Sequence, residues 1–578
     1  MEKINDIFGS LVFNDAVMRE RLPKATYRAL KESMETGTDL TVDVANVIAA
    51  EMKNWALEKG ATHFAHWFQP LTGMTAEKHD AFISPNGDGT VIMDFSGKEL
   101  IKGEPDGSSF PSGGIRSTFE ARGYTNWDPT SYAFIKEKTL CIPTAFCSYA
   151  GEALDEKTPL LRSMDAINKQ GLRITKILGM NDVKKIVTSV GPEQEYFLVD
   201  RDIFEARPDL VYCGRTLFGS KPPKRQELHD HYFGAIKPRV KEFMEDLNNE
   251  LWKVGILSRT EHNEVAPSQH EMAPIYTETN VALDHNQLTM EILKKVAERH
   301  DMACLLHEKP FAGVNGSGKH TNWSISTDTG IGLLDPGKKP EENTIFLITL
   351  AAVIQAADEY QDLLRVSVAS AGNDHRLGGH EAPPAIISMF LGDELTNVVE
   401  SIVSGTEPKK YDEAKMEFGA TMLPTFMRDN TDRNRTSPLA FTGNRFEFRM
   451  TGSNMSIGDA CYVLNTIVAE SFRQFADRLE QADDVETEVK ALLRDVLTKH
   501  QRIIFNGNGY SDEWVAEAEK RGLPNIRSMV DAIPALNTEK AVTLFEKFKV
   551  FTKAELDSRV EIEYETYAKE INIEAKAM

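Results

Sequence analysis

Two glutamates lie two residues apart in the β-prone segment Gly191-Pro-Glu193-Gln-Glu195-Tyr-Phe-Leu-Val. Because the side chains of a strand alternate between its two faces, we expect both carboxylates to point the same way. Two negative charges at that spacing repel each other unless a cation lies between them, which is what a divalent-metal site provides. A solvated strand face is the alternative, and this segment alone does not decide between the two.

A glycine-rich loop leads into a second candidate strand, Asn315-Gly-Ser-Gly-Lys-His320-Thr-Asn322-Trp-Ser324. His320, Asn322 and Ser324 would share one face of this strand. A lone histidine is more often a core residue than a ligand, but polar partners at every second position favour a site. The segment also fits the phosphate-loop pattern GxxxxGK. However, His320 stands where that loop needs Ser or Thr, and the residues that follow alternate like a strand, so we reject that interpretation.

A third segment, Asn444-Arg-Phe-Glu-Phe-Arg-Met450, separates charged from apolar side chains. Arg445, Glu447 and Arg449 would share one face, and the apolar residues between them would face a core. A surface ladder of ion pairs is the alternative, and it would contribute little stability. In a fourth segment, Glu264-Val-Ala-Pro-Ser-Gln-His-Glu271, two glutamates bracket a turn.

Two further loops combine arginine with glycine or polar residues. One runs from Gly372 to Pro384 and contains Arg376 and Glu381, and the other is Asn430-Thr-Asp-Arg-Asn-Arg435-Thr-Ser-Pro. Guanidinium groups suit carboxylate and phosphate oxygens. Five carboxylates, a histidine and several arginines therefore indicate metal-assisted phosphoryl transfer.

The elements that must position these residues follow from periodicity. Residues 1–60 read as helical, with helical spacing over Leu40–Leu57 and a stop at Gly60. Residues 61–150 alternate short β-prone runs with turns: Asn86-Gly-Asp-Gly89 predicts a hairpin, and Gly103–Gly114 predicts a long functional loop.

From Gly151 onward long helices alternate with strands, which predicts an α+β fold with a sheet lined by helices. The predicted helices span 157–170, 236–254, 281–306, 345–366, 453–479 and 485–504. The predicted strands span 186–190, 196–199, 321–325 and 445–450. Residues after about 481 read as helical and charged, and the last helix would continue beyond Met578.

Composition narrows the class of protein. The chain has 578 residues, 41% of them hydrophobic, and a formal net charge of −22. That charge repels phosphate backbones and anionic lipid, so we expect neither nucleic acid nor membrane as a partner. Five cysteines without a CxxC pair fit a reducing cytoplasm, and the first residues do not resemble a signal peptide.

Taken together and in this order, the motifs resemble glutamine synthetase. GPEQE is similar to that family's GxExE strand, NGSGKH to its NGSGxH loop, NRFEFR to its RxExR strand and EVAPSQHE to its paired-glutamate segment. The segment HWFQPLTGMTAEKHDAF, residues 66–82, resembles the type III branch.

The resemblance implies two or more magnesium or manganese ions per site, with ATP as a substrate. Glu195, Glu264 and Glu271 would hold the first ion, on the glutamate and ammonia side. Glu193, His320 and Glu447 would hold the second ion, which would bridge the ATP phosphates.

The same resemblance implies roles for the remaining residues. Glutamate would be held by Asn315, Gly316 and Arg376 on the Glu264 side, and Arg449 would meet its activated carboxylate. Arg435 would stabilise the transferring phosphoryl group, with Arg445, Ser324 and Asn322 near the nucleotide. Asp106 would deprotonate ammonium, and Glu381 would close the site as a flap.

The implied reaction joins ammonia to the γ-carboxylate of L-glutamate through γ-glutamyl phosphate, giving glutamine, ADP and phosphate. The implied fold is α+β: a helical extension (1–60), a β-grasp-like domain (61–152), a catalytic domain with a curved antiparallel sheet lined by helices (153–480), and a helical, truncated C-terminal extension (481–578). The implied assembly is a homo-oligomer of hexameric rings, stacked as a dodecamer.

Two alternatives remain open. A relative that ligates glutamate to another amine would keep the same metal and aspartate groups. A catalytically inactive relative is the non-enzyme alternative, but it would be expected to lose metal ligands, and all six are present.

Overall fold

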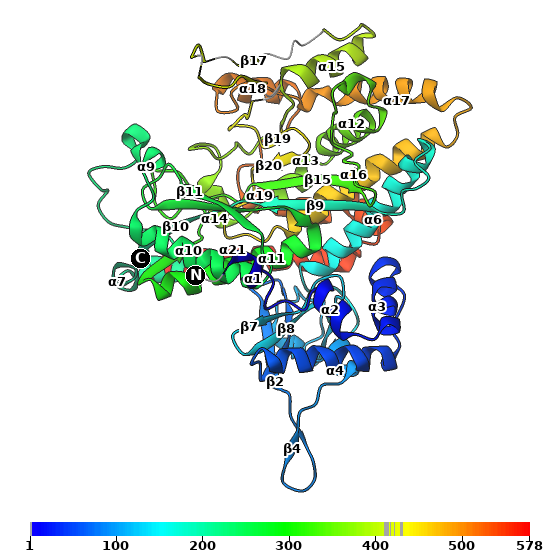
Figure 1. Ribbon diagram of the computed structural model, residues 1–578. Helices are drawn as coiled ribbons and strands as arrows, with labels where there is room; N and C mark the ends of the chain where they lie inside the picture. Colours follow the sequence, from blue (N-terminus) through cyan, green and yellow to red (C-terminus); the bar gives the residue numbers. More distant parts are fainter. Residues whose placement is uncertain (1–2, 410–414, 417, 421, 428–431) are drawn as a thin grey trace.

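The computed structural model describes residues 3–409, 415–416, 418–420, 422–427 and 432–578 (Figure 1). Residues 430 and 431, which begin the predicted Arg435 loop, lie outside this range. The fold mixes helices and sheets, as the sequence predicts. Among the described helices, none is both long and apolar enough to cross a membrane.

The N-terminal part combines helices with a mixed sheet, drawn in blue and cyan at the bottom of Figure 1. Its helices are α1 (Ile4–Ile7), α2 (Asp15–Arg21), α3 (Lys24–Thr36), α4 (Val42–Glu58) and α5 (Gly97–Ile101). Its main sheet has the order β2 (Ala76–Ala81), β1 (His63–Phe68), β8 (Thr139–Ser148), β6 (Gly123–Trp127) and β5 (Lys102–Gly103), with β7 (Phe134–Lys136) beside β8.

Helix α4 covers this sheet because one of its faces is apolar. The Thr41 hydroxyl accepts a hydrogen bond from Val44 N at its start, and Gly60, with φ +86°, follows its end. Ile48 and Trp55 are buried in one core cluster with Leu140 of β8. The predicted helix and its stop are therefore confirmed.

The predicted hairpin is also confirmed. Strands β3 (Ser84–Pro85) and β4 (Val91–Ile92) pair antiparallel, and Asn86 N donates to Thr90 O at 3.0 Å. Gly87 and Gly89 adopt the positive φ that the turn requires. The hairpin projects downward from the molecule in Figure 1.

The strands of two sheets carry five of the predicted site residues, Glu195, Glu271, Asn322, Ser324 and Glu447. One has the order β13 (Thr277–Glu278), β9 (Ile186–Pro192), β15 (Thr321–Thr327), β20 (Phe446–Phe448), β19 (Leu439–Phe441) and β16 (Met389–Phe390). The other has the order β11 (Ser258–Asn263), β12 (Gln269–Pro274), β10 (Gln194–Asp200) and β14 (Met302–Leu305). Only Glu193 separates β9 from β10, so the chain passes directly from one sheet to the other and the surface curls.

Helices cover the apolar face of the first sheet. They are α6 (Lys157–Ile177), α11 (Thr279–Arg299), α12 (Thr344–Glu359), α13 (Gln361–Val366) and α16 (Gly458–Leu479). Trp323 of β15 is fully buried in their common core and donates from Nε1 to Asn465 Oδ1 of α16 at 2.9 Å. Phe446 and Phe448 lie in the same core, and burial of each contributes about 1.5–3 kcal/mol.

The structure corrects several predicted boundaries. The helix predicted over 281–306 is wrong at its end: α11 stops at Arg299, and Met302–Leu305 forms β14. Asp301, with φ +53°, turns the chain, and β14 then pairs with β10. The helix predicted over 345–366 breaks at Tyr360, the helix predicted from 453 begins at Gly458, and the strand predicted over 445–450 shortens to Phe446–Phe448.

The C-terminal part is helical, as predicted. It comprises α17 (Val485–His500), α18 (Asp512–Lys520), α19 (Met529–Ala532), α20 (Glu539–Lys547) and α21 (Lys553–Ala577). Leu493, Phe545 and Leu556 from this part join Phe472 of α16 in one core cluster. The predicted domain boundaries and the β-grasp character of the N-terminal sheet stay predictions.

The remaining elements lie in connections around the two sheets. They are α7 (Arg201–Glu205), α8 (Pro208–Cys213), α9 (Asp230–Phe233), α10 (Pro238–Lys253), α14 (Ala371–Arg376), α15 (Gly392–Ser404), β17 (Lys415–Met416) and β18 (Phe426–Met427).

Candidate active site

Strand pairing brings the predicted glutamates together. Glu195 of β10 lies directly opposite Glu271 of β12, and His262 of β11 lies opposite Glu271 on its other side. Like charges placed opposite each other on neighbouring strands are destabilising by themselves. This register therefore favours a positive charge between the strands.

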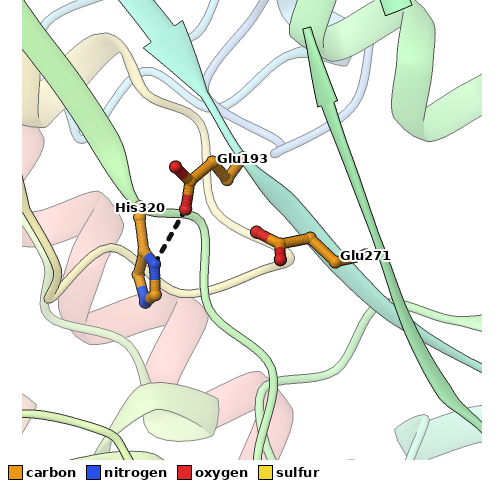
Figure 2. Close-up of side chains that lie close together, drawn as sticks. All are labelled: Glu193, Glu271 and His320. Carbon is orange, nitrogen blue, oxygen red and sulfur yellow. Dashed lines mark hydrogen bonds and ion pairs between the residues drawn. The ribbon is translucent and has the colours of Figure 1, made fainter. Parts of the chain in front are cut away.

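His320 lies just before β15, beside the junction of the two sheets. Its Nδ1 is 3.0 Å from Glu193 Oε2 and 3.3 Å from Glu447 Oε1. Figure 2 shows Glu193 pointing at this ring, with the Glu271 carboxylate on the neighbouring strand directed toward the same space. Arg449 Nη1 donates to Glu447 Oε1 at 3.0 Å, so the arginine borders the cluster.

Two groups of side chains have the spacing of metal ligands. Ligand atoms of Glu193, Glu271 and His320 lie within 4.8 Å of one another, and so do those of His262, Glu264 and Glu271. Glu195 lies beside both groups, opposite Glu271, and its Oε2 accepts from Gly318 N at 2.6 Å. The structure thus brings the six predicted ligands into one region.

The protonation of these groups fits a cation site. Burial, together with the charge of Glu264, raises the pKa of Glu195 to about 7. Burial and the charge of Glu271 raise the pKa of Glu264 to about 8. Burial opposes charge on Glu447 too, but hydrogen bonding to His320 brings the pKa of Glu447 to about 2. The carboxylates outnumber their positive partners, and an oxygen-rich set with imidazole suits magnesium or manganese.

His262 belongs to this cluster, although sequence reasoning missed it. Its Nε2 is 2.7 Å from Glu271 Oε2, and its Nδ1 is 3.5 Å from Glu264 Oε1. The hydrogen bond to Glu271 raises the pKa of His262 to about 9. Its position two residues before Glu264 was the available signal, because alternation along a strand places both on one face.

The glycine loop before β15 lies against Arg376. A Cβ on Gly318 would be 2.1 Å from Arg376 Nη2, so only glycine fits this approach. Arg376 Nη2 donates to Arg449 O at 3.0 Å, and Nη1 donates to the carbonyl groups of Met450 and Thr451. Arg376 therefore holds the chain that follows β20, and its contact with glutamate stays a prediction.

Asn315 and Gly316 occupy the same loop. Asn315 N donates to Gln226 Oε1 at 2.8 Å, and Gln226 Nε2 donates to Asn315 Oδ1 at 3.0 Å. A Cβ on Gly316 would lie 2.3 Å from Glu308 O. Sequence reasoning missed Gln226, since its contact spans 89 residues of chain.

Hydrogen bonds link the predicted nucleotide residues to the cluster. Arg445 Nε donates to Asn322 Oδ1 at 3.0 Å, and Asn322 Nδ2 donates to Glu193 Oε1 at 3.0 Å. Ser324 Oγ donates to Asn444 O at 2.8 Å. The alternation predicted for β15 thus places Asn322 and Ser324 on the face opposite buried Trp323.

The two predicted loops meet at an ion pair. Arg435 Nη1 is 2.8 Å from Glu381 Oε1. Arg435 is exposed and Glu381 is half-buried, so the pair lies at the surface of the site.

Comparison with known proteins decides the family. Family models described as glutamine synthetase type III N terminal, glutamine synthetase catalytic domain and glutamine synthetase C-terminal domain match residues 4–163, 173–387 and 488–578. The type-3 glutamine synthetase of Dictyostelium discoideum is 50% identical over 585 residues, covering 100% of this chain and 80% of that protein. The chain belongs to the type III glutamine synthetases.

Other relatives agree with this assignment. The glutamine synthetase of Butyrivibrio fibrisolvens is 48% identical over 584 residues, covering 100% of this chain and 82% of that protein. A solved structure titled "Apo GmaS without ligand" shares the fold, with a TM-score of 0.54 and 15% identity over 89% of this chain and 95% of that chain. As a glutamine synthetase, the chain is a glutamate–ammonia ligase, and its family depends on ATP and divalent metal ions.

Asp106 lies in the N-terminal part, outside the two sheets that form the glutamate cluster. It lies in the loop between β5 and β6, where its Oδ1 accepts from Ser108 N at 2.9 Å. Hydrogen bonds to the hydroxyl and amide groups of Ser108 lower the pKa of Asp106. Within the described residues it makes no hydrogen bond or ion pair with another predicted site residue.

Proposed function

We propose that this chain joins ammonia to the γ-carboxylate of L-glutamate through γ-glutamyl phosphate, with release of ADP and phosphate. The observation that carries this proposal is the cluster of Glu193, Glu271, His320 and Glu447, bordered by Arg449. A carboxylate is a poor electrophile, so an amine can attack it only after activation. Anionic side chains that hold cations, next to an arginine, suit the transfer of a phosphoryl group onto another anion.

We assign the ligand sets as the resemblance to glutamine synthetase implies, and the proximity of the side chains supports this assignment. Glu195, Glu264 and Glu271 would hold one magnesium or manganese ion, and His262 lies close enough to assist. Glu193, His320 and Glu447 would hold another. When bound, such ions neutralise phosphate charge and polarise phosphoryl oxygens.

The chain's own residues would orient the substrates. Asn315, Gly316 and Arg376, with Glu264 beside them, would bind glutamate, and Arg449 would face its γ-carboxylate. Arg445, Asn322 and Ser324 would contact the nucleotide, and a structure titled "GmaS/ADP complex-Conformation 1", which shares this fold, binds ADP. Arg435 would stabilise the charge of the transferring phosphoryl group. Glu381 would close over the acyl phosphate and keep water out.

Asp106 would act across a subunit boundary. Among the described residues it makes no hydrogen bond or ion pair with the cluster of its own chain, so we assign it to the site of a neighbouring subunit, where it would take a proton from ammonium. Such a head-to-tail contact forms a ring where the rotation between subunits closes, which is the case that we propose here. The proposed assembly is a homo-oligomer of hexameric rings, stacked as a dodecamer.

Isotope transfer tests the proposed intermediate. L-Glutamate labelled with ¹⁸O in its γ-carboxylate is incubated with ATP, magnesium and ammonium, and the released phosphate is analysed by mass spectrometry. Activation by phosphorylation moves one labelled oxygen into each phosphate. Unlabelled phosphate accompanied by glutamine would contradict the mechanism. Replacing ammonium with a panel of amines in the same assay identifies the nitrogen donor.

A further inference from the structure

A loop of the C-terminal part lies against both loops of the Arg435–Glu381 pair. This loop comprises residues 505–511, Phe-Asn-Gly-Asn-Gly-Tyr-Ser. It is attached at both ends: Phe505 N donates to Met389 O of β16 at 2.8 Å, and Ser511 Oγ accepts from Trp514 N at 3.1 Å at the start of α18. Loop 505–511 therefore connects β16, the edge strand of the sheet that contains β9, β15 and β20, to the C-terminal helices.

Loop 505–511 contacts the residues on either side of Arg435. Asn434 Nδ2 donates to Gly507 O at 2.9 Å, and Gly509 N donates to Thr436 Oγ1 at 2.8 Å. Thr436 Oγ1 also donates to Asn434 Oδ1 at 2.8 Å, which ties the two neighbours together. The backbone that presents Arg435 is thus fixed from both sides.

Tyr510 contacts the loop of Glu381. Its hydroxyl donates to Ala382 O at 2.9 Å. His380 and Glu381, directly before Ala382, have φ of +53° and +69°. Two consecutive non-glycine residues in this region are strained, and such a conformation persists only where the surroundings hold it. The Tyr510 hydroxyl supplies one of these restraints.

We propose that loop 505–511 positions the catalytic pair, with Tyr510 as the positioning residue for Glu381. It holds the Glu381 loop where that carboxylate meets Arg435, so that the acyl phosphate is covered once it forms. This inference rests on the proposed roles of Glu381 and Arg435. The new element is that loop 505–511, which is distant in sequence from Glu381, determines where the Glu381 carboxylate lies when it covers the acyl phosphate.

Tyr510→Phe removes the hydroxyl and keeps the ring. With a looser Glu381 loop, water reaches γ-glutamyl phosphate, and its hydrolysis returns glutamate and releases phosphate without forming glutamine. We expect the ratio of phosphate released to glutamine formed to rise above that of the unaltered chain. We also expect kcat to fall about two- to tenfold, the effect of one neutral hydrogen bond, with little change in KM for ATP.

Tyr564→Phe is the matched control, since Tyr564 on α21 is 36% exposed against 38% for Tyr510. Its ratio, kcat and urea midpoint should match those of the unaltered chain. A lower urea midpoint for Tyr510→Phe with an unchanged ratio would show a structural role only and overturn the inference.

The Glu381→Gln background separates this inference from the proposed function. If Tyr510 acts through Glu381, Tyr510→Phe adds little to the ratio that Glu381→Gln has already raised. Additive effects would overturn the inference and leave the role of Glu381 standing. An unchanged ratio in Glu381→Gln itself would overturn the flap role, and the inference with it.

Discussion

Glu264 and Glu271, two of the proposed metal ligands, show how burial affects single carboxylates. Each carboxylate is buried beside another carboxylate, so the pKa of Glu264 is raised to about 8 and that of Glu271 is also raised. A divalent ion bound here would reverse this preference, because it would stabilise the charged forms that burial destabilises. We therefore expect the removal of one glutamate charge to change the metal affinity of this site more than it changes the free energy of unfolding.

Glu264→Gln keeps the size of the side chain and removes its charge. We expect activity to fall and the magnesium concentration for half-maximal activity to rise severalfold, because one anionic ligand is lost. Activity is measured over a magnesium titration. Glu242→Gln on the exposed face of α10 is the control. Unchanged turnover at limiting magnesium would contradict the ligand assignment.

Arg435→Lys keeps the charge and removes the planar fork of the guanidinium. Since Arg435 is exposed, the free energy of unfolding should change little, whereas kcat should fall more than ATP affinity. Steady-state kinetics with varied ATP separate the two. A raised KM with an unchanged kcat would make Arg435 a binding residue only.

At the scale of elements, close contacts between loops constrain the positions of the site residues more than the strands do. Gly318 illustrates this, because its backbone passes so close to the Arg376 guanidinium that no side chain fits between them. The loop before β15, helix α14 and the chain after β20 are thereby fixed to one another.

Gly318→Ala should displace Arg376 and, through it, the carbonyl groups that follow β20. We expect a large loss of activity and destabilisation of about 1–3 kcal/mol, measured by glutamine formation and urea unfolding. Gly332→Ala is the control, since its Cβ would meet Asp335 Cβ at an ordinary 3.4 Å. Wild-type activity in Gly318→Ala would show that Arg376 can move without consequence.

Sequence alone predicted the elements with clear periodicity and missed what depends on long-range contact. The alternation in β15 and the helical spacing of α4 were sufficient, because each has one apolar face. The short apolar run at residues 302–306 fits the end of a helix and a buried strand equally well, so periodicity alone does not distinguish the two. The six ligand candidates came from local spacing and the family resemblance. Tyr510, by contrast, reaches Ala382 across 128 residues, and no local pattern reports such a contact.

At the scale of the whole molecule, the C-terminal helices add acidic groups to a cavity of about 650 Å³ that also includes Glu308, next to the glycine loop. Glu563 of α21 lines this cavity with Glu156 and Asp459. Burial, then the charge of Asp459, raises the pKa of Glu563 to about 8. Packing of α21 therefore involves a carboxyl group that resists ionisation.

This shift predicts how stability depends on pH. The ordinary pKa of glutamate is 4.5, so between about pH 4.5 and pH 8 the unfolded chain has lost a proton that folded Glu563 still holds. The free energy of unfolding should fall as pH rises through this window. Glu563→Gln removes that contribution, so its urea midpoint should exceed that of the unaltered chain by more at pH 8.5 than at pH 5. Glu561→Gln, exposed on α21, should show no such difference.

Assembly is tested by mixing two inactive chains. Asp106→Ala and Glu447→Ala should each be nearly inactive alone. Randomly co-assembled, about a quarter of the interfaces would pair an intact Asp106 with an intact Glu447, and activity should return to about that level. If the subunits mix, as shown by mass spectrometry, and no activity returns, then Asp106 acts in its own subunit.

The direct passage from β9 to β10 has a consequence for how this gene can change over evolutionary time. Glu193 contacts His320 and Glu195 lies opposite Glu271, and this arrangement depends on the single residue that separates the two strands. One inserted or deleted codon here would turn every following side chain of β10 to the opposite face and move Glu195 away from Glu271. The β3–β4 hairpin, whose tip projects from the molecule, has no such constraint. We therefore expect length variation among descendants of this gene at the hairpin, and a fixed length from Val190 to Tyr196.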